Sequence, residues 1–116
     1  MIRILGYNLE KNKQIYIALT NIYGVGVARA KTILKNLNIT PTKKIYNLSD
    51  LEITNIRNMF ENATFLIEGN LKRFVAQNIK RLIEINCYKG RRHLKKLPVR
   101  GQRTRTNSRS TRKIKN

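Results

Sequence analysis

Apolar residues recur at helical spacing over most of the chain before its last quarter. Ile15, Leu19 and Ile22 lie three or four positions apart, which places them on one face of a helix. Gly24 then ends the pattern, because glycine favours a helix terminus. A second pattern of the same kind begins near Val27. The two patterns predict a pair of short helices joined by a tight turn.

Two longer helices are predicted farther along. The third begins at a capping box, in which Ser49 caps the helix and the Glu52 carboxylate reaches back to the cap. The fourth covers residues 69–86, with apolar residues on one face and basic residues mostly opposite. Its apolar face consists of Leu71, Phe74, Val75, Ile79, Leu82 and Ile83. We expect the three phenylalanines of the chain to lie in the core: Phe60, Phe65 and Phe74.

The two ends of the chain lack helical periodicity. Ile2 and Ile4 alternate ahead of a glycine, which predicts a short strand or extended arm. Residues 88–116 hold few apolar side chains, and Pro98 and two glycines favour an extended path over a helix. The patterns therefore predict an all-α domain at residues 1–87 and an extended tail at residues 88–116. Alone in water, this tail is expected to be disordered.

Charge separates these two parts further. The 116-residue chain has a formal net charge of +19, from 25 basic and 6 acidic side chains. Twelve of the basic side chains lie in residues 88–116, which contain no Asp or Glu. A run of positive side chains without any negative ones predicts a polyanionic partner rather than a merely solvated surface. A membrane fits poorly, since the tail has no apolar face for lipid and no stretch approaches the roughly 18–20 apolar residues of a membrane-spanning helix.

The tail favours nucleic acid as this polyanion. The guanidinium fork of Arg matches phosphate oxygens, and Gln, Thr and Asn side chains donate to phosphate and sugar. Such residues alternate in the second half of the tail: Arg100, Gln102, Arg103, Thr104, Arg105, Asn107, Arg109 and Arg112. Four basic residues of the fourth helix face either solvent or RNA, and the neighbouring basic tail favours RNA: Lys72, Arg73, Lys80 and Arg81.

The turn between the first two helices has two interpretations. Gly24 and Gly26 could let backbone N–H groups approach a phosphate at the positive end of the following helix dipole. Equally, Gly24 could cap the first helix and Gly26 could form a tight turn without any ligand. The motif is no dinucleotide fingerprint, because no clear strand precedes it and no third glycine follows at the right place.

The inventory of reactive residues argues against an enzyme. The chain has a single cysteine, Cys87, and a single histidine, His93, which are too few for a Cys/His zinc site. The two lie six residues apart with no orienting acid nearby, so they form a weak nucleophile pair. We therefore expect no catalytic residues, no metal and no cofactor. His93 is better placed to stack on a nucleotide or bond to it.

Several motifs resemble one known family. Residues 88–93 read YKGRRH and residues 97–107 read LPVRGQRTRTN, which is similar to the signature of bacterial-type ribosomal protein thirteen of the small subunit. Farther back, IALT at 17–20, IYGVG at 22–26 and IKRL at 79–82 resemble the same family. The resemblance covers essentially the whole chain. Two positions depart from the family pattern: Glu10, where Pro is frequent, and Ser108, where Ala is usual.

This resemblance implies a structural role without catalytic activity. The family fold has a helical domain with a helix–two-turns–helix unit, a long helix and an extended basic tail. The implied partners are small-subunit rRNA, peptidyl-site tRNA, a neighbouring protein of the subunit head and the large subunit, bridged by the N-terminal domain. The turn at residues 24–26 would then face phosphate, and residues 100–109 would thread into rRNA. The first rRNA contacts of the tail would be Arg91, Arg92 and His93, and the tRNA contacts Arg112, Lys113 and Lys115.

Two alternatives accompany this interpretation. A DNA-compacting protein or a DNA-repair module could use the same helical unit and basic charge, although the chain is too short to add a base-flipping catalytic domain. The abundance of Ile, Asn and Lys suggests an AT-rich gene, and no import presequence is visible. We therefore expect an organelle-encoded protein of the mitochondrial ribosome, with a plastid or an AT-rich bacterium as alternatives.

Overall fold

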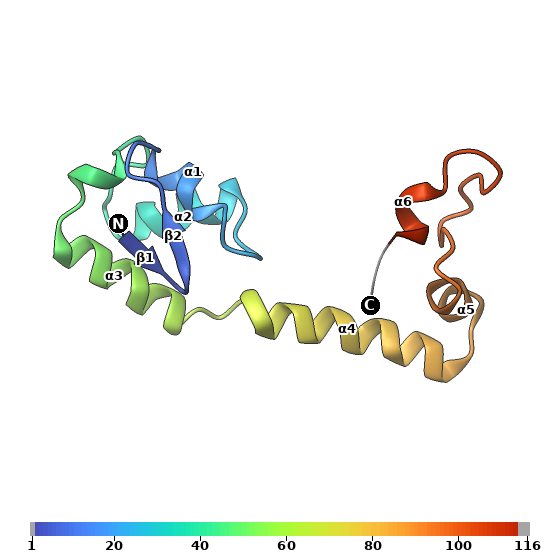
Figure 1. Cartoon of the computed structure of the whole chain (residues 1–116). Helices are drawn as coiled ribbons and strands as arrows, with labels where there is room; N and C mark the ends of the chain where they lie inside the picture. Colours follow the sequence, from blue (N-terminus) through green and yellow to red (C-terminus); the bar gives the residue numbers. More distant parts are fainter. Residues whose placement is uncertain (1, 114–116) are drawn as a thin grey trace. The chain divides into compact units, whose positions relative to one another are not determined.

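The computed structural model describes residues 2–113 (Figure 1). The chain divides into two compact units, with the division after Leu71. The expected boundary after residue 87 followed the change in charge. The compact units divide earlier, because most of the long helix groups with the basic segment that follows it.

The N-terminal unit opens with a β-hairpin. Strand β1 (Ile2–Ile4) pairs antiparallel with β2 (Tyr7–Leu9), and Ile4 and Leu9 are fully buried. Leu5 and Gly6 form the turn with positive φ angles of 48° and 84°. The predicted strand at residues 2–4 is therefore present. Its partner strand, which the sequence analysis did not predict, makes the fold mostly helical with one small two-stranded sheet.

The helices of this unit follow the predicted order. They are α1 (Ile15–Leu19), α2 (Val27–Asn36), the 3₁₀ helix η1 (Ile45–Asn47) and α3 (Asp50–Glu61). The hairpin and these helices share one core of small and branched residues. Its largest fully buried side chains are Ile4, Leu9, Ile15, Leu19, Ile22, Leu34, Ile45 and Ile56. Burial of these apolar side chains provides the main driving force for folding of this unit.

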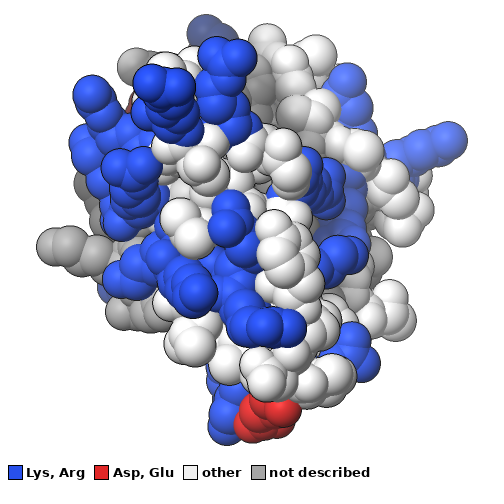
Figure 2. Space-filling model, turned by 90° about the vertical axis from the view of Figure 1, so that its right-hand side faces the viewer, with Lys and Arg blue, Asp and Glu red and all other residues white. Residues whose placement is uncertain are grey.

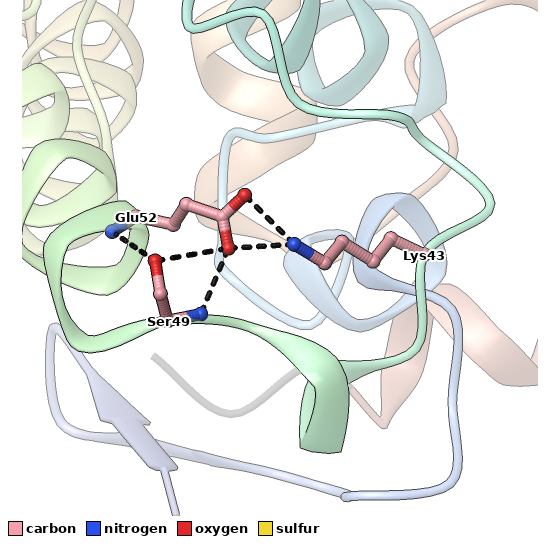
Figure 3. Close-up of polar contacts among 3 residues, drawn as sticks. All are labelled: Lys43, Ser49 and Glu52. Atoms are coloured by element: carbon pink, nitrogen blue, oxygen red, sulfur yellow. Dashed lines mark hydrogen bonds and ion pairs between the residues drawn. The ribbon is translucent and has the colours of Figure 1, made fainter.

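The capping box predicted at the start of α3 is confirmed (Figure 3). The Glu52 backbone N–H donates to Ser49 Oγ at 3.3 Å, and the Ser49 backbone N–H donates to Glu52 Oε2 at 2.8 Å. Lys43 adds an ion pair that the sequence did not suggest, with Nζ 2.8 Å from both carboxylate oxygens. Hydrogen bonds from Lys43 and then Ser49 lower the pKa of Glu52 below its ordinary value of 4.5. One carboxylate therefore ties the loop before η1 to the first turn of α3.

Helix α4 (Glu68–Ile85) begins in the N-terminal unit. The Glu68 backbone N–H donates to the Tyr23 carbonyl oxygen at 2.9 Å. The Glu68 side chain accepts a hydrogen bond from Tyr7, which raises the pKa of the tyrosine hydroxyl. These contacts anchor the first turn of α4 to the hairpin and to the turn after α1.

The apolar face of α4 differs from the prediction. No residue of this helix is buried, and the side chains of Phe74 and Val75 are 49% and 41% exposed. Phe60 lies in the core and Phe65 packs against it, but the expectation that Phe74 is a core residue is wrong. The periodicity correctly indicated a helix, because it depends on spacing alone. It could not indicate whether another part of this chain covers the apolar face.

Within residues 72–113, the C-terminal unit contains the rest of α4 and two further helices, α5 (Tyr88–Leu94) and α6 (Arg109–Arg112). The expected tail is thus partly helical, whereas residues 95–108 form no regular helix or strand. Helix α5 forms despite its glycine because Cys87 caps it and Gly90 fits closely against α4. Within residues 2–113, no helix is both long enough and apolar enough to cross a membrane.

The ion pair at the cap of α3 leads to a prediction. Glu52→Gln keeps an oxygen that can accept from Ser49 but removes the charge that pairs with Lys43. Both partners are about a quarter to a third exposed (25% and 30%), so solvent screening limits the effect. We expect the free energy of unfolding to fall by about 0.5–1 kcal/mol at pH 7. Urea titration of the full chain, followed by the helical circular dichroism signal, measures this change.

The same variant should show a defined pH dependence. Because folding lowers the pKa of Glu52, the stabilisation is complete above the unfolded-state value and is lost as pH falls through the folded-state value. The difference between wild type and Glu52→Gln should therefore shrink at acidic pH. Glu61→Gln, at the exposed end of α3, is the control and should have little effect at either pH. A difference that persists in full at pH 2 would rule out the ionised carboxylate as its cause.

Candidate nucleic-acid interface

Basic side chains are concentrated in the C-terminal unit. Residues 72–113 contain fifteen Lys or Arg and one acid, Glu84, whereas residues 2–71 contain nine Lys or Arg and five acids. Figure 2 shows a face on which many Lys and Arg side chains are spread among other residues, whereas acidic atoms appear only at its lower edge. Such an excess of one sign creates a positive potential that attracts polyanions.

The four predicted basic residues of α4 are all exposed. Lys80 Nζ lies 3.7 Å from Glu84 Oε1, and these two side chains are 76% and 64% exposed. An ion pair this exposed contributes little to stability, so it leaves Lys80 able to exchange its partner for a phosphate. Lys72, Arg73 and Arg81 share this exposure, which keeps both the solvent and the RNA interpretations of the basic face open.

Close backbone packing holds α5 against α4. The Gly90 N–H donates to the Cys87 sulfur at 3.4 Å. The Cys87 thiol in turn donates to the Leu82 carbonyl oxygen of α4, also at 3.4 Å. Gly90 is buried, and a methyl group on it would overlap the Leu82 carbonyl oxygen and lie 2.8 Å from Ile83 N. The glycine in the YKGRRH motif is therefore required by the approach of two helices.

Helix α5 presents the first predicted RNA contacts in different ways. Arg91 is exposed, whereas Arg92 and His93 are partly buried. Arg92 Nε donates to the Pro98 carbonyl oxygen at 3.0 Å, and its guanidinium carbon lies 5.8 Å from the centre of the Tyr88 ring. Arg92 therefore organises the turn after α5, a role that the sequence analysis did not predict.

The segment after Pro98 is held by hydrogen bonds to one backbone carbonyl. Thr104 O accepts from Ser108 Oγ at 2.9 Å and from Arg112 Nη2 at 3.1 Å. Ser108 is only 3% exposed, so its hydroxyl occupies an interior position, where it bonds to the Thr104 carbonyl oxygen. The remaining predicted RNA-contacting side chains of this segment are exposed: Arg100, Gln102, Arg103, Thr104, Arg105, Asn107 and Arg109. The segment can therefore present many donors from a backbone that its own side chains shape.

The candidate tRNA contacts lie at the end of the described chain. Arg112 and Lys113 are exposed, although Arg112 also holds Thr104 as described above. Lys115 lies outside the described residues.

The two glycines of the early turn belong to the N-terminal unit and differ from each other. Gly24 has a φ of +97°, and a methyl group there would lie 2.9 Å from Leu71 Cδ2. Its carbonyl oxygen accepts from Arg29 Nη1 at 2.8 Å. Close packing and a positive φ thus explain Gly24 without a ligand. Gly26 precedes α2 as its N-cap, and a methyl group there would meet nothing within 4 Å, so only Gly26 leaves space at the backbone.

Sequence reasoning missed the residues that shape the interface from within. Cys87, Gly90 and Ser108 were not predicted to contact RNA, yet each one positions part of the basic segment at residues 88–113. The departure from the family pattern at Ser108 was the only signal for that residue. Within the described part of the chain, no group of three or more His, Cys, Asp or Glu is arranged to hold a metal ion.

Comparison with known proteins gives one family and a set of close relatives. Residues 3–110 match the family model described as ribosomal protein S13/S18. Proteins named small ribosomal subunit protein uS13c are 54% identical in Porphyra purpurea, 52% in Pyropia yezoensis and 47% in Cyanophora paradoxa. Each alignment spans 112 residues, which is 97% of this chain and 88% of the relative.

These relatives correct the expected location. The names carry the suffix of the chloroplast form, which contradicts the expectation of a mitochondrial ribosome and fits the plastid alternative. The expectation failed because a composition rich in Ile, Asn and Lys reflects an AT-rich gene. It does not distinguish one kind of organelle genome from another.

The packing of Gly90 generates a second prediction. Gly90→Ala should force α5 away from α4, because the added methyl group meets the rigid backbone of Leu82. Overpacking of this kind costs about 1–3 kcal/mol, so amide exchange in α5 should accelerate roughly tenfold or more. Hydrogen exchange measures the effect at the amides of Arg91 and Lys95, which donate to the carbonyl oxygens of Cys87 and Arg91 at the two ends of α5.

Gly69→Ala is the matched control. It adds the same methyl group within α4, where nothing lies within 4 Å. Alanine is the better helix former, so this variant should be neutral or slightly stabilising. Equal protection of α5 in wild type and Gly90→Ala would show that the helices tolerate separation and that the close approach is not required.

Proposed function

The chain belongs to the ribosomal protein S13/S18 family and is a small-subunit ribosomal protein, and on this premise we propose that it binds small-subunit rRNA in the subunit head, chiefly through its C-terminal unit. Proteins of this family are structural, which agrees with the expectation that the chain is not an enzyme. The observation that carries the proposal is the charge of residues 72–113, where fifteen basic side chains accompany a single acid. The proposed setting is the plastid ribosome.

The geometry of the basic segment supports rRNA as its main partner. Thr104 O and Pro98 O are satisfied by side chains of the segment itself, so the path of the backbone is defined locally. Exposed Arg, Gln and Asn side chains project from this path and can donate to phosphate, sugar and base edges. The proposed contacts are Lys72, Arg73, Lys80, Arg81, Arg91, Arg92, His93, Arg100, Gln102, Arg103, Thr104, Arg105, Asn107 and Arg109.

The end of the chain is proposed to reach peptidyl-site tRNA. Lys113 is exposed at the end of the described chain, and lysine is a flexible point charge suited to a mobile phosphate backbone. Arg112 is proposed to bind tRNA with the donors that Thr104 does not use, and Lys115 extends the same charge. These contacts would add to the rRNA contacts and would not be needed to hold the protein in the subunit.

The N-terminal unit is proposed to contact proteins. Its charge is more nearly balanced, and Tyr46 and Leu51 expose 56% and 77% of their surface near the start of α3. Exposed apolar side chains with few like charges suit a bridge to the large subunit or a contact with a neighbouring head protein better than an rRNA backbone. The space at Gly26 is the remaining candidate for a phosphate-facing turn in this unit.

The salt dependence of rRNA binding tests the proposed contact surface. Changing Arg100, Arg103, Arg105 and Arg109 to Gln removes four proposed phosphate contacts. Each neutralised phosphate contributes a slope of about −0.7 to −0.9 in log K against log salt, so the slope should flatten by roughly 3. Filter binding of the full chain to small-subunit rRNA between 50 and 300 mM KCl measures it, with duplex DNA as the competitor for the DNA-binding alternative.

An equal change of charge elsewhere is the control. Lys11, Lys31, Lys35 and Lys44 changed to Gln remove four charges from the N-terminal unit, and this variant should flatten the slope by less than about 1. Equal slopes for the two variants would contradict direct contacts, because only the net charge would then matter. Tighter binding to duplex DNA than to rRNA would contradict the proposed partner.

A second test separates tRNA contacts from rRNA contacts. Deleting residues 113–116 should leave the protein in the subunit and weaken peptidyl-site tRNA binding by about 1–2 kcal/mol, because exposed charges at a chain end are screened. Arg112 is retained, since it also holds Thr104. The matched variant, Arg100→Gln with Arg103→Gln, should instead reduce incorporation. Protein occupancy and tRNA affinity of purified small subunits are the measurements, and loss of incorporation on deletion alone would reverse the assignment.

A further inference from the structure

A pocket of about 390 Å³ lies within the C-terminal unit. Ile79 and Ile83 of α4 line it together with Leu97, Pro98 and Val99 from the segment after α5. Its volume is at the lower end of pockets that hold small organic groups. The lining is mainly apolar, so the pocket favours a flat or compact apolar group over a hydrated ion.

Polar and charged side chains complete the lining. His93 and Gln102 offer ring nitrogens and an amide, which can donate to or accept from the edge of a planar heterocycle. Lys96 and Arg100 also line the pocket, and both are exposed. The pocket therefore combines an apolar interior with hydrogen-bonding edges and two cations.

The charge around the pocket identifies the kind of occupant. The single acid of residues 72–113, Glu84, is paired with Lys80, so the surroundings favour a ligand that carries negative charge. A phosphate alone would satisfy Lys96 and Arg100 but would leave the apolar interior empty. An unstacked nucleotide satisfies both, because its base is planar and apolar on its faces and its phosphates are anionic.

We propose that this pocket holds one unpaired nucleobase of the bound RNA, with the base against Ile79, Ile83 and Val99 and the adjoining phosphates at Lys96 and Arg100. This inference deepens the rRNA-binding function proposed above and rests on it. His93 and Gln102 contact the edge of the base and give the site its preference among bases. The C-terminal unit thus recognises a splayed nucleotide as well as a phosphate backbone.

Single-stranded RNA decamers test the site on the full chain. Four decamers, each with one kind of base, are compared with a decamer of abasic ribose that has the same number of phosphates. At least one of the four should bind more tightly than the abasic decamer by about fivefold or more, as expected for burial of a base. Equal affinities for all five would overturn the proposal, because the phosphates alone would then explain binding.

A pocket-filling variant locates the effect. Val99→Trp places a large ring in the pocket without changing the charge, so it should abolish the advantage of the base-containing decamer while leaving the salt slope unchanged. Arg100→Gln should instead flatten the slope by about 0.7–0.9 and keep part of that advantage. Thr106→Trp adds the same ring at an exposed position outside the pocket and should keep the full advantage.

The outcomes distinguish this inference from the function on which it rests. If Val99→Trp retains the base advantage of wild type, the pocket is not the base site and the proposal fails, whereas binding to rRNA remains. If wild type binds none of the RNAs, small-subunit rRNA included, the proposed function itself fails. Circular dichroism and hydrogen exchange in α5 establish that Val99→Trp is folded. If that variant does not fold, Gln102→Ala replaces it, and an unchanged ranking of the four bases with Gln102→Ala would overturn the site.

Discussion

The contact between Gly90 and the backbone of Leu82 is the constraint on which the C-terminal unit depends. Among its described residues, 72–113, few apolar side chains are buried, so this part of the chain cannot rely on a large core as the N-terminal unit does. Instead, the backbones of α5 and α4 pack directly against each other at Gly90, where no side chain intervenes. The Cys87 sulfur links the two helices, because it accepts from the Gly90 N–H and donates to the Leu82 carbonyl oxygen, each at 3.4 Å. The position of α5 determines where Arg92 can reach the Pro98 carbonyl oxygen, and hence how the basic segment leaves the helix.

Local sequence signals predicted the elements well where one short-range interaction decides the structure. The capping box at Ser49 and Glu52 is such a case, since both partners lie within one helical turn. The hairpin was missed because its turn places Leu5 at a positive φ of 48°, and leucine is not a residue that signals such a turn. The exposure of Phe74 was missed for a different reason. Spacing indicates that an apolar face exists, but only tertiary structure shows whether this chain covers it.

The candidate site was predictable in its chemistry and much less so in its geometry. The excess of Arg and Lys near the C-terminus is a property of composition, and it led to nucleic acid without any structure. The pocket beside His93 could not be predicted, because its walls come from residues up to 32 positions apart in the sequence, such as Ile79, Val99 and Thr111. Gly24 shows the opposite error. The sequence suggested phosphate binding at this glycine, but close packing against Leu66 and Leu71 explains it once the structure is known.

The arginines of this protein have a consequence for how its gene can change. Arg29, Arg57, Arg92 and Arg112 each donate to a backbone carbonyl oxygen, whereas Lys13, Lys43 and Lys80 pair with carboxylates. Lysine keeps the charge of arginine, but its ammonium lacks the several N–H donors that the planar guanidinium holds in fixed directions. Mutational pressure toward A and T, which enriches lysine codons, can therefore replace arginines that serve only as charge. At these four positions the same change replaces a planar guanidinium, which now donates to a backbone carbonyl oxygen, with a single flexible ammonium, so it alters a structural contact as well as a charged side chain.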